Sequence, residues 1–288
     1  MKQTPSWLPV LSVLAGATLG ASSGLYIKSA GFSSLAMTGF RMGIPVLLTL
    51  PSMLRGGRAL GIPGQRKGLW IASSINAVRM LIFVMAYKMT SVGNAVVLLY
   101  LWPIFALIFD GIRLRQTPGA ARVGLVALSF AGVVIMNLHR GFGVSGTDMY
   151  GSLLMIAASA GFAVTVIMFK KALATVRETD AIYFQNAVGA VIYIPFLIAE
   201  LGSASVPDIA TGAAYGALVG MAGFFCFFFA MKRLPIFQYG ALAYSEVPIG
   251  VLLGVLVLGE SFAPNQLAGA VIVVTASFLA QRLRTKAA

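Results

Sequence analysis

Residues 93–110 read GNAVVLLYLWPIFALIFD, and the fold of the whole chain can be inferred outward from this stretch. It is apolar enough to cross a membrane, yet it contains Asn94, two amphipathic aromatic residues and, in its middle, Pro103. A proline inside a helix cannot donate the backbone hydrogen bond and clashes with the preceding turn, which costs about 3 kcal/mol in an exposed helix. In a bilayer such a break persists where neighbouring helices or a water-filled cavity satisfy the freed carbonyls. The stretch therefore predicts a broken helix that forms a cavity wall.

The composition indicates an integral membrane protein. Of the 288 residues, 59% are hydrophobic and only 10% are charged, with a mean hydropathy of +0.90. The net charge of +13 does not indicate nucleic acid binding, because the basic residues form short clusters between apolar runs. His139 and Cys226 are each the only residue of their kind, and no cluster for metal or nucleophilic chemistry is available. We therefore expect a lipid bilayer as the surroundings, no cofactor or metal, no nucleic acid partner and no enzyme.

Apolar runs long enough to cross the hydrocarbon layer recur along the whole chain. A span of about 20 residues crosses about 30 Å of hydrocarbon. The first run is too long for a signal-peptide core, and similar runs follow it, so we expect it to be retained as a helix. The sequence predicts ten transmembrane helices at 7–27, 33–53, 68–88, 92–111, 118–138, 149–169, 180–200, 209–231, 236–258 and 264–282.

The basic residues also predict the orientation. With the N-terminus inside, sixteen Lys and Arg residues fall in cytoplasmic segments, and only Lys28, Lys88 and Arg140 fall outside. Cytoplasmic loops of membrane proteins are enriched in Lys and Arg. Both termini are therefore expected to be cytoplasmic.

The two halves of the chain resemble each other at an offset of 144 to 145 residues. A second apolar stretch reads Tyr244-Ser245-Glu246-Val247-Pro248, so Pro248 corresponds to Pro103, and Lys232 corresponds to Lys88. Each half holds five helices, an odd number, so the second half enters the membrane upside down. We therefore expect two inverted five-helix repeats, 1–147 and 148–288, an arrangement typical of transporters.

Several motifs resemble a known family. Leu258-Gly259-Glu260, the run Gln266-Leu267-Ala268-Gly269 and the position of Pro248 are similar to the EamA domain of the drug/metabolite transporter superfamily. Arg115 stands where the first domain would have its glutamate. Tyr100-Leu101-Trp102-Pro103 further resembles the fourth helix of the YddG-type aromatic amino acid exporters. The resemblance implies an exporter of aromatic and other neutral amino acids in a bacterial inner membrane.

Arg79 is the most informative polar residue. An arginine at mid-bilayer costs roughly 2.5 to 3.5 kcal/mol on insertion scales, so it should face a partner or water. Asn76, Arg79, Phe83 and Tyr87 lie on one stripe of the third helix. The guanidinium could hold a substrate carboxylate beside a stacked ring. The alternative is a structural ion pair with Glu246.

Glu246 is the matching acidic candidate. Two residues before Pro248, it could bind a substrate ammonium or exchange protons during transport. The alternative is a pairing role with Arg41 or Arg79. Arg41 itself lies nearer the end of its helix, and we expect it to be structural, with its side chain extending to the interface.

Aromatic and amide side chains complete the expected site. Tyr100 and Trp102 differ by about 200° on an ideal helix, so both can face one cavity only if the proline distorts the turn. Asn186 is the best cavity candidate among the uncharged polar residues, and Tyr244 is expected to contribute to side-chain selection. Phe224 and Phe228 share a face and could line an apolar pocket.

The residues predict a secondary transporter that works by alternating access. Arg79 would bind the carboxylate of an amino acid and Glu246 its ammonium or a proton, with Asn76 and Phe83 also in the substrate site. The family resemblance implies that the substrates include Trp, Phe and Tyr. The alternative is efflux of cationic or apolar drugs on the same fold, with Glu246 binding the cation and Arg79 structural. Nothing in the sequence decides the oligomeric state, which could be monomeric, or the coupling to protons.

Overall fold

The computed structural model describes residues 7–90, 92–115, 117–138, 146–258 and 263–283. His139, Arg140 and the Gly259-Glu260 pair lie outside the described residues. The helices of the first half are α1 (Leu8–Ala21), α2 (Ser23–Ser29), α3 (Ser34–Arg55), α4 (Arg66–Met89), α5 (Val92–Leu99), α6 (Trp102–Leu114) and α7 (Ala120–Asn137). Those of the second half are α8 (Gly146–Ala172), α9 (Glu178–Leu201), α10 (Val206–Ala214), the π-helix η2 (Tyr215–Gly223), α11 (Phe224–Arg233), α12 (Ile236–Ala243), α13 (Glu246–Leu258) and α14 (Pro264–Arg282).

The all-helical membrane fold is confirmed. Within the described residues, eight helices are long and apolar enough to cross a membrane, from Leu8–Ser29 to Val206–Arg233. The other two expected spans are present as α12 with α13 and as α14. The boundary that we placed between the halves, at residues 147 and 148, falls in the first turn of α8.

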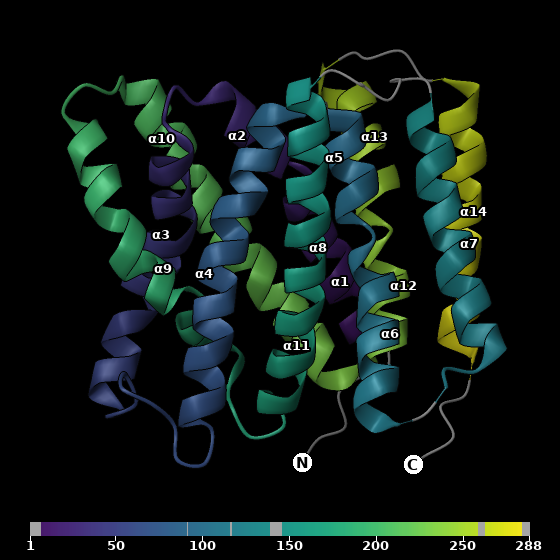
Figure 1. The fold of residues 1–288 in the computed structure, drawn as a ribbon, viewed down its shortest axis with the longest axis horizontal. Helices are drawn as coiled ribbons and strands as arrows, with labels where there is room; N and C mark the ends of the chain where they lie inside the picture. The colour runs from purple at the N-terminus through teal and green to yellow at the C-terminus, as the bar shows by residue number, and fades with distance from the viewer. Residues whose placement is uncertain (1–6, 91, 116, 139–145, 259–262, 284–288) are drawn as a thin grey trace.

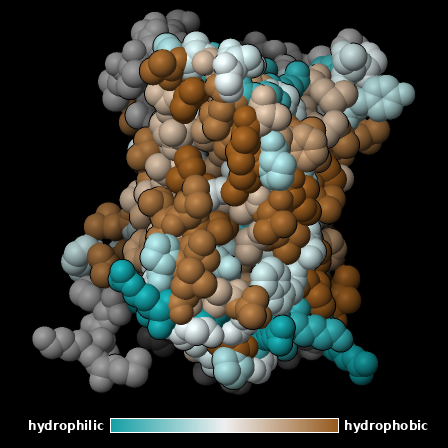
Figure 2. All heavy atoms as spheres, turned by 90° about the vertical axis from the view of Figure 1, so that its left-hand side faces the viewer, coloured by the Kyte–Doolittle hydropathy of each residue, from teal (hydrophilic) through white to brown (hydrophobic). Residues whose placement is uncertain are grey.

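The helices stand side by side in one bundle (Figure 1). The first turn of α1 and the last turn of α14 lie at the same edge of the bundle, together with the ends of α3, α6, α8 and α11. Basic residues occupy the last turns of these four helices. Figure 2 shows the resulting pattern on one face, with a broad apolar band and hydrophilic side chains gathered at its lower end. That this edge is cytoplasmic remains a prediction from the charges.

The chain breaks at corresponding places in the two halves. The α5–α6 break lies at Tyr100 and Leu101, and the α12–α13 break lies at Tyr244 and Ser245. In α6 the proline occupies the first turn, where its missing N–H is not needed. Pro103 also leaves the carbonyl of Leu99 without its helical donor, and the hydroxyl of Ser159 in α8 donates to that carbonyl at 2.8 Å. A neighbouring helix thus satisfies the freed carbonyl, as the sequence predicts for a break inside a bundle.

Corresponding helices of the two halves pack against each other through glycines. In the α7–α14 pair, Gly132 and Gly269 bring the two backbones together, and a Cβ atom on Gly269 would lie 2.4 Å from the carbonyl oxygen of Gly132. The α3–α9 pair is similar, since a Cβ atom on Gly39 would lie 2.8 Å from the Tyr193 carbonyl oxygen. Small residues permit such close contacts between membrane helices. The halves are therefore intertwined rather than placed side by side as separate units.

Replacing Gly269 with alanine is expected to lower the thermal stability of the protein in detergent. The added methyl group has backbone atoms on one side and Met136 at 2.4 Å on the other, so α7 and α14 must separate. Overpacking of this kind costs roughly 1 to 3 kcal/mol. The melting temperature, followed by intrinsic fluorescence, measures the effect. Gly124→Ala in α7 is the matched control because a Cβ atom there meets nothing within 4 Å; an equal melting temperature for the two variants would contradict the packing argument.

Candidate functional site

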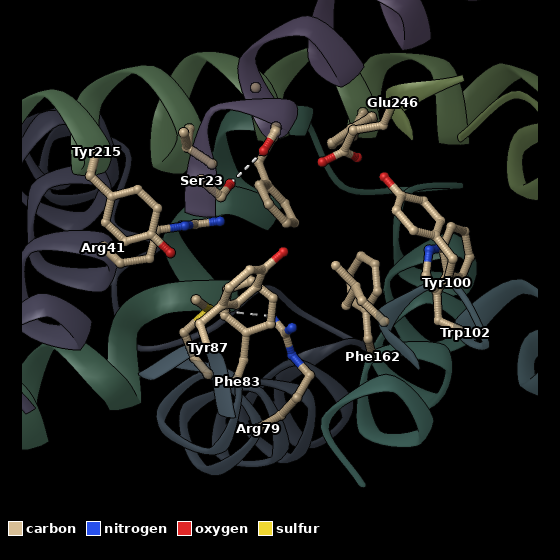
Figure 3. Close-up of a pocket in the computed structure, with 17 residues that line it drawn as sticks. Ser23, Arg41, Arg79, Phe83, Tyr87, Tyr100, Trp102, Phe162, Tyr215 and Glu246 are labelled. Carbon is tan, nitrogen blue, oxygen red and sulfur yellow. Dashed lines mark hydrogen bonds between the residues drawn. The ribbon is translucent and has the colours of Figure 1, made fainter. Parts of the chain in front are cut away.

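A cavity of about 640 Å³, a volume that includes its opening to solvent, lies between the two halves near the helix breaks. Its walls come from α1, α2, α3, α4 and the α5–α6 break in the first half, and from α8, η2, α11 and α13 in the second. Figure 3 shows charged and aromatic side chains pointing into it from both halves. Ligand sites in transporters with inverted repeats lie at such an interface.

The broken helix brings both of its aromatic side chains to this cavity. Tyr100 and Trp102 both line it, although they would face different directions on an ideal helix. The turn at Tyr100 and Leu101 removes the conflict, because α6 restarts at Trp102. The Trp102 ring packs edge-on against Phe162 of α8, with ring centroids 5.1 Å apart. The distortion that the sequence required at Pro103 is therefore present, on the N-terminal side of the proline.

Arg79 of α4 is held in place by an amide network. Its Nε and Nη2 atoms donate to the side-chain oxygen of Asn76 at 3.1 and 2.8 Å. The amide nitrogen of Asn76 in turn donates to the backbone carbonyl of Gln185 in α9 at 2.7 Å. The guanidinium carbon lies 4.8 Å from the centroid of the Phe162 ring, which is favourable for a cation over an aromatic face. Asn76 thus lies behind Arg79 and orients it, and does not line the cavity.

Glu246 begins α13 and lies in the opposite wall, against α1. A Cβ atom on Gly20 would lie 2.6 Å from its Oε1 atom, so the carboxylate rests directly on the bare backbone of that glycine. The Tyr100 hydroxyl points toward the carboxylate (Figure 3), but it is buried without a hydrogen-bond partner among the described residues. Glu246 lines the cavity and forms no ion pair with Arg41 or Arg79 within that set. The pairing alternatives are therefore absent from this conformation.

Arg41 differs from its expected placement. The residue is only 3% exposed and lines the cavity, instead of extending to the interface. Its guanidinium carbon lies 4.6 Å from the Phe224 ring centroid and 5.9 Å from that of Tyr215. A glycine in η2 explains the difference, because a Cβ atom on Gly220 would lie 3.1 Å from the Arg41 Nη1 atom. The missing side chain leaves room for the arginine between α3 and η2.

Besides Asn76, two other residues expected in the substrate site do not line the cavity. Asn186 is 1% exposed in α9, and its side-chain amide donates to the Ile182 carbonyl one turn earlier at 2.8 Å. The amide that we expected to bind substrate is therefore bonded to the backbone of its own helix. Tyr244 is fully buried behind Tyr100, with ring centroids 5.7 Å apart. It can support Tyr100 but cannot contact a ligand in this conformation.

The remaining aromatic residues are divided between the cavity and the core. Phe83 and Phe224 line the cavity, whereas Phe228 packs against Phe169 with centroids 5.3 Å apart. Phe162 and Tyr215 also line it and were not expected. Tyr215 stands between Gly212 and Gly216, a pattern that indicates only helix packing. Within the described residues, no group of three or more His, Cys, Asp or Glu side chains is placed to hold a metal ion.

Known proteins resemble this chain over most or part of its length. The model of the EamA-like transporter family matches residues 7–138 and 149–281. The threonine/homoserine exporter RhtA of Escherichia coli is 24% identical over 290 residues, covering 96% of this chain and 92% of that protein. The uncharacterized transporter YcxC of Bacillus subtilis is 25% identical over 183 residues, covering 60% of this chain and 59% of that protein. A crystal structure with 19% identity superposes with a TM-score of 0.75 over 96% of this chain and 99% of the other, which shows a shared fold.

Proposed function

Since this chain belongs to the EamA-like transporter family, we propose that it is a secondary transporter that exports amino acids, with aromatic and other neutral ones as the expected substrates. Membership alone establishes a multi-pass membrane transporter and not an enzyme. The proposal adds the substrate class and the residues that would bind it.

One observation carries the proposal. Arg79 and Glu246 line one cavity from opposite walls, and no ion pair joins them in the described part of the chain. Arg79 is buried and Glu246 half-buried, and charges removed from water are costly without a partner of opposite sign. The carboxylate and ammonium of an α-amino acid supply both partners in one molecule. The planar fork of Arg79 suits the carboxylate, and Glu246 suits the ammonium.

The side-chain part of the site is aromatic. Phe83, Tyr100, Trp102 and Phe162 give the cavity rigid apolar surfaces. Such surfaces favour a hydrophobic or aromatic substrate side chain. The similarity to a threonine/homoserine exporter supports amino acids as the substrate class. The aromatic walls of the cavity support aromatic amino acids within that class.

The inverted halves suggest how the cavity changes sides. Tyr100 lies at the break in the first half, and Glu246 follows the break in the second. A short interruption of helical hydrogen bonds is a place where a helix can bend with small changes elsewhere. We propose that bending at the two breaks opens the cavity alternately to the two sides, with the α7–α14 pair moving as one body.

Counterflow in proteoliposomes tests the function. Vesicles loaded with unlabelled tryptophan, or in parallel threonine, should accumulate the same labelled amino acid, and leucine should compete while lysine should not. Accumulation with this competition supports a neutral amino acid carrier. Vesicles that are tight, contain correctly folded protein and accumulate neither amino acid would contradict the proposal.

Efflux of cationic drugs is the second candidate, because Glu246 and the aromatic walls could also hold a cation. Arg41 and Arg79 oppose it, since two guanidiniums in the same cavity repel a positively charged ligand. Replacement of Arg79 distinguishes the candidates: a drug exporter should retain or improve its transport, whereas an amino acid exporter should lose it.

Replacing Gly20 with alanine is expected to reduce counterflow about tenfold or more. The new methyl group would lie 2.6 Å from the Glu246 carboxylate and must push it out of place, and small misplacements of binding groups cost large factors in rate. Initial rates of counterflow give the measurement. Gly250→Ala is the control at the same α1–α13 contact, because its Cβ atom would meet Ala21 at an ordinary 3.5 Å. Equal rates for both variants would contradict the proposal that the position of the Glu246 carboxylate on Gly20 matters for transport.

A further inference from the structure

The cavity contains one more positive charge than an ordinary amino acid can use. Arg41 and Arg79 both turn their guanidinium groups into it (Figure 3). Among its described lining residues, Glu246 is the single acidic side chain. The two arginines are 3% and 6% exposed, and neither has a carboxylate within ion-pair distance in the described chain.

Arg41 has different neighbours from Arg79. Arg79 has the Asn76 side-chain oxygen as an acceptor. Arg41 instead lies over aromatic faces, 4.6 Å from the Phe224 centroid and 5.9 Å from that of Tyr215. The Tyr215 hydroxyl beside it is fully buried and has no hydrogen-bond partner among the described residues. A guanidinium and an unused hydroxyl, both able to donate, thus lie together at one end of the cavity.

The charge balance then indicates the missing group. A zwitterionic amino acid bound between Arg79 and Glu246 brings one negative and one positive charge, so Arg41 stays uncompensated. An amino acid with a second acidic group brings two negative charges and one positive charge, which matches the two arginines and one glutamate. Buried charges are stabilised when each is paired and hydrogen-bonded.

Building on the proposed amino acid export, we infer that Arg41 and Tyr215 bind a second acidic group of the substrate, so that amino acids with an acidic side chain bind more tightly than their neutral counterparts. Arg79 and Glu246 hold the α-carboxylate and ammonium, and the aromatic walls lie between the two ends. Neutral amino acids remain substrates of lower affinity.

Competition against labelled tryptophan, or against threonine where that exchanges, tests the inference. Two pairs of competitors differ only by an acid and its amide: glutamate with glutamine, and 4-carboxyphenylalanine with 4-carbamoylphenylalanine. Counterflow is measured with the membrane potential held at zero by valinomycin and equal potassium, since the competitors differ in charge. A charge-assisted hydrogen bond should make the acid of at least one pair about tenfold more potent than its amide.

The variants assign this preference to residues. In Arg41→Gln the ratio between acid and amide should fall to about one, Arg41→Lys should keep part of it, and Tyr215→Phe should reduce it. Arg55→Gln, an exposed arginine at the end of the same helix, should leave the ratio unchanged. Because the readout is a ratio, a general loss of transport in a variant does not imitate the result.

Three outcomes would overturn the inference. Equal potency of acid and amide in both pairs of the unmodified protein would do so while leaving amino acid export intact. A preference that survives in Arg41→Gln would place the acidic group elsewhere. If counterflow of neutral amino acids needs chloride in the unmodified protein but not in Arg41→Gln, a free anion occupies the site instead of a substrate group. Failure of every amino acid to exchange would instead contradict the proposed function itself.

Discussion

Replacing Glu246 with glutamine is expected to reduce amino acid counterflow roughly a hundredfold or more, because removing one partner of a buried charged pair costs about 3 to 5 kcal/mol. The carboxylate lies on Gly20 and beside the Tyr100 hydroxyl, with no basic partner within ion-pair distance in the described chain. A substrate ammonium is therefore the partner that we propose for it. Glutamine has nearly the same shape and cannot supply the negative charge.

A ligand without an ammonium separates binding from folding in this variant. Indole-3-propionate is tryptophan without its amino group, and it should compete poorly in the unmodified protein because it leaves Glu246 unpaired. In Glu246→Gln the difference between tryptophan and indole-3-propionate should largely disappear. Glu200→Gln provides the control, since Glu200 lies at the end of α9, where its carboxylate accepts a hydrogen bond from the Ser33 backbone N–H. Full counterflow in Glu246→Gln would remove its proposed role.

Replacing Arg79 with glutamine is expected to reduce amino acid counterflow roughly a hundredfold or more, because the α-carboxylate loses its charged partner. The guanidinium is the fork proposed for the α-carboxylate, and Asn76 orients it from behind through the two hydrogen bonds to its side-chain oxygen. Glutamine is too short to reach the same position and carries no charge. Initial rates of tryptophan counterflow measure the loss.

Tryptamine, which is tryptophan without its carboxylate, checks the assignment of the charge. It should compete weakly in the unmodified protein, and its disadvantage relative to tryptophan should shrink in Arg79→Gln. Arg66→Gln, an exposed arginine in the first turn of the same helix, should behave like the unmodified protein. Unchanged tryptophan counterflow in Arg79→Gln would contradict the proposed binding of the α-carboxylate by this arginine and leave it a structural role.

The fold could be predicted from the sequence because a bilayer restricts the possibilities so strongly. Apolar length fixes the spans, and Pro103 and Pro248 fix where two of them are interrupted. The helix break also follows from local chemistry, since a proline affects its own preceding turn. The sequence predicts that some neighbouring group donates a hydrogen bond to the freed carbonyl. It does not identify Ser159 as the donor to Leu99, because Ser159 lies on another helix.

The site was predicted less completely because side-chain direction depends on neighbours that are distant in the sequence. The residues next to Arg41 in the sequence do not determine whether its side chain extends to the interface or turns inward. Gly220, 179 residues later, leaves the space that lets it turn inward. Asn186 looks equally suited to a cavity, yet its own helix supplies its acceptor at Ile182. Arg79 and Glu246 line the cavity because a charge facing lipid would be costly, and Tyr100 and Trp102 line it because the break turns them inward. Phe83 lines it because it shares the stripe of Arg79 on α4.

Substrate protection of a cysteine placed in the cavity shows whether amino acids bind there. Ser23 lines the cavity beside Gly20, and Ser23→Cys is made together with Cys226→Ala so that one thiol remains. The rate of its alkylation by a small maleimide is measured with and without a saturating amino acid that the variant still exchanges. We expect the amino acid to slow labelling several-fold at Ser23→Cys, and to leave the labelling rate unchanged at Ser203→Cys, an exposed position after α9. Equal labelling rates at Ser23→Cys with and without a saturating, exchanging amino acid would contradict the account and place the binding site elsewhere.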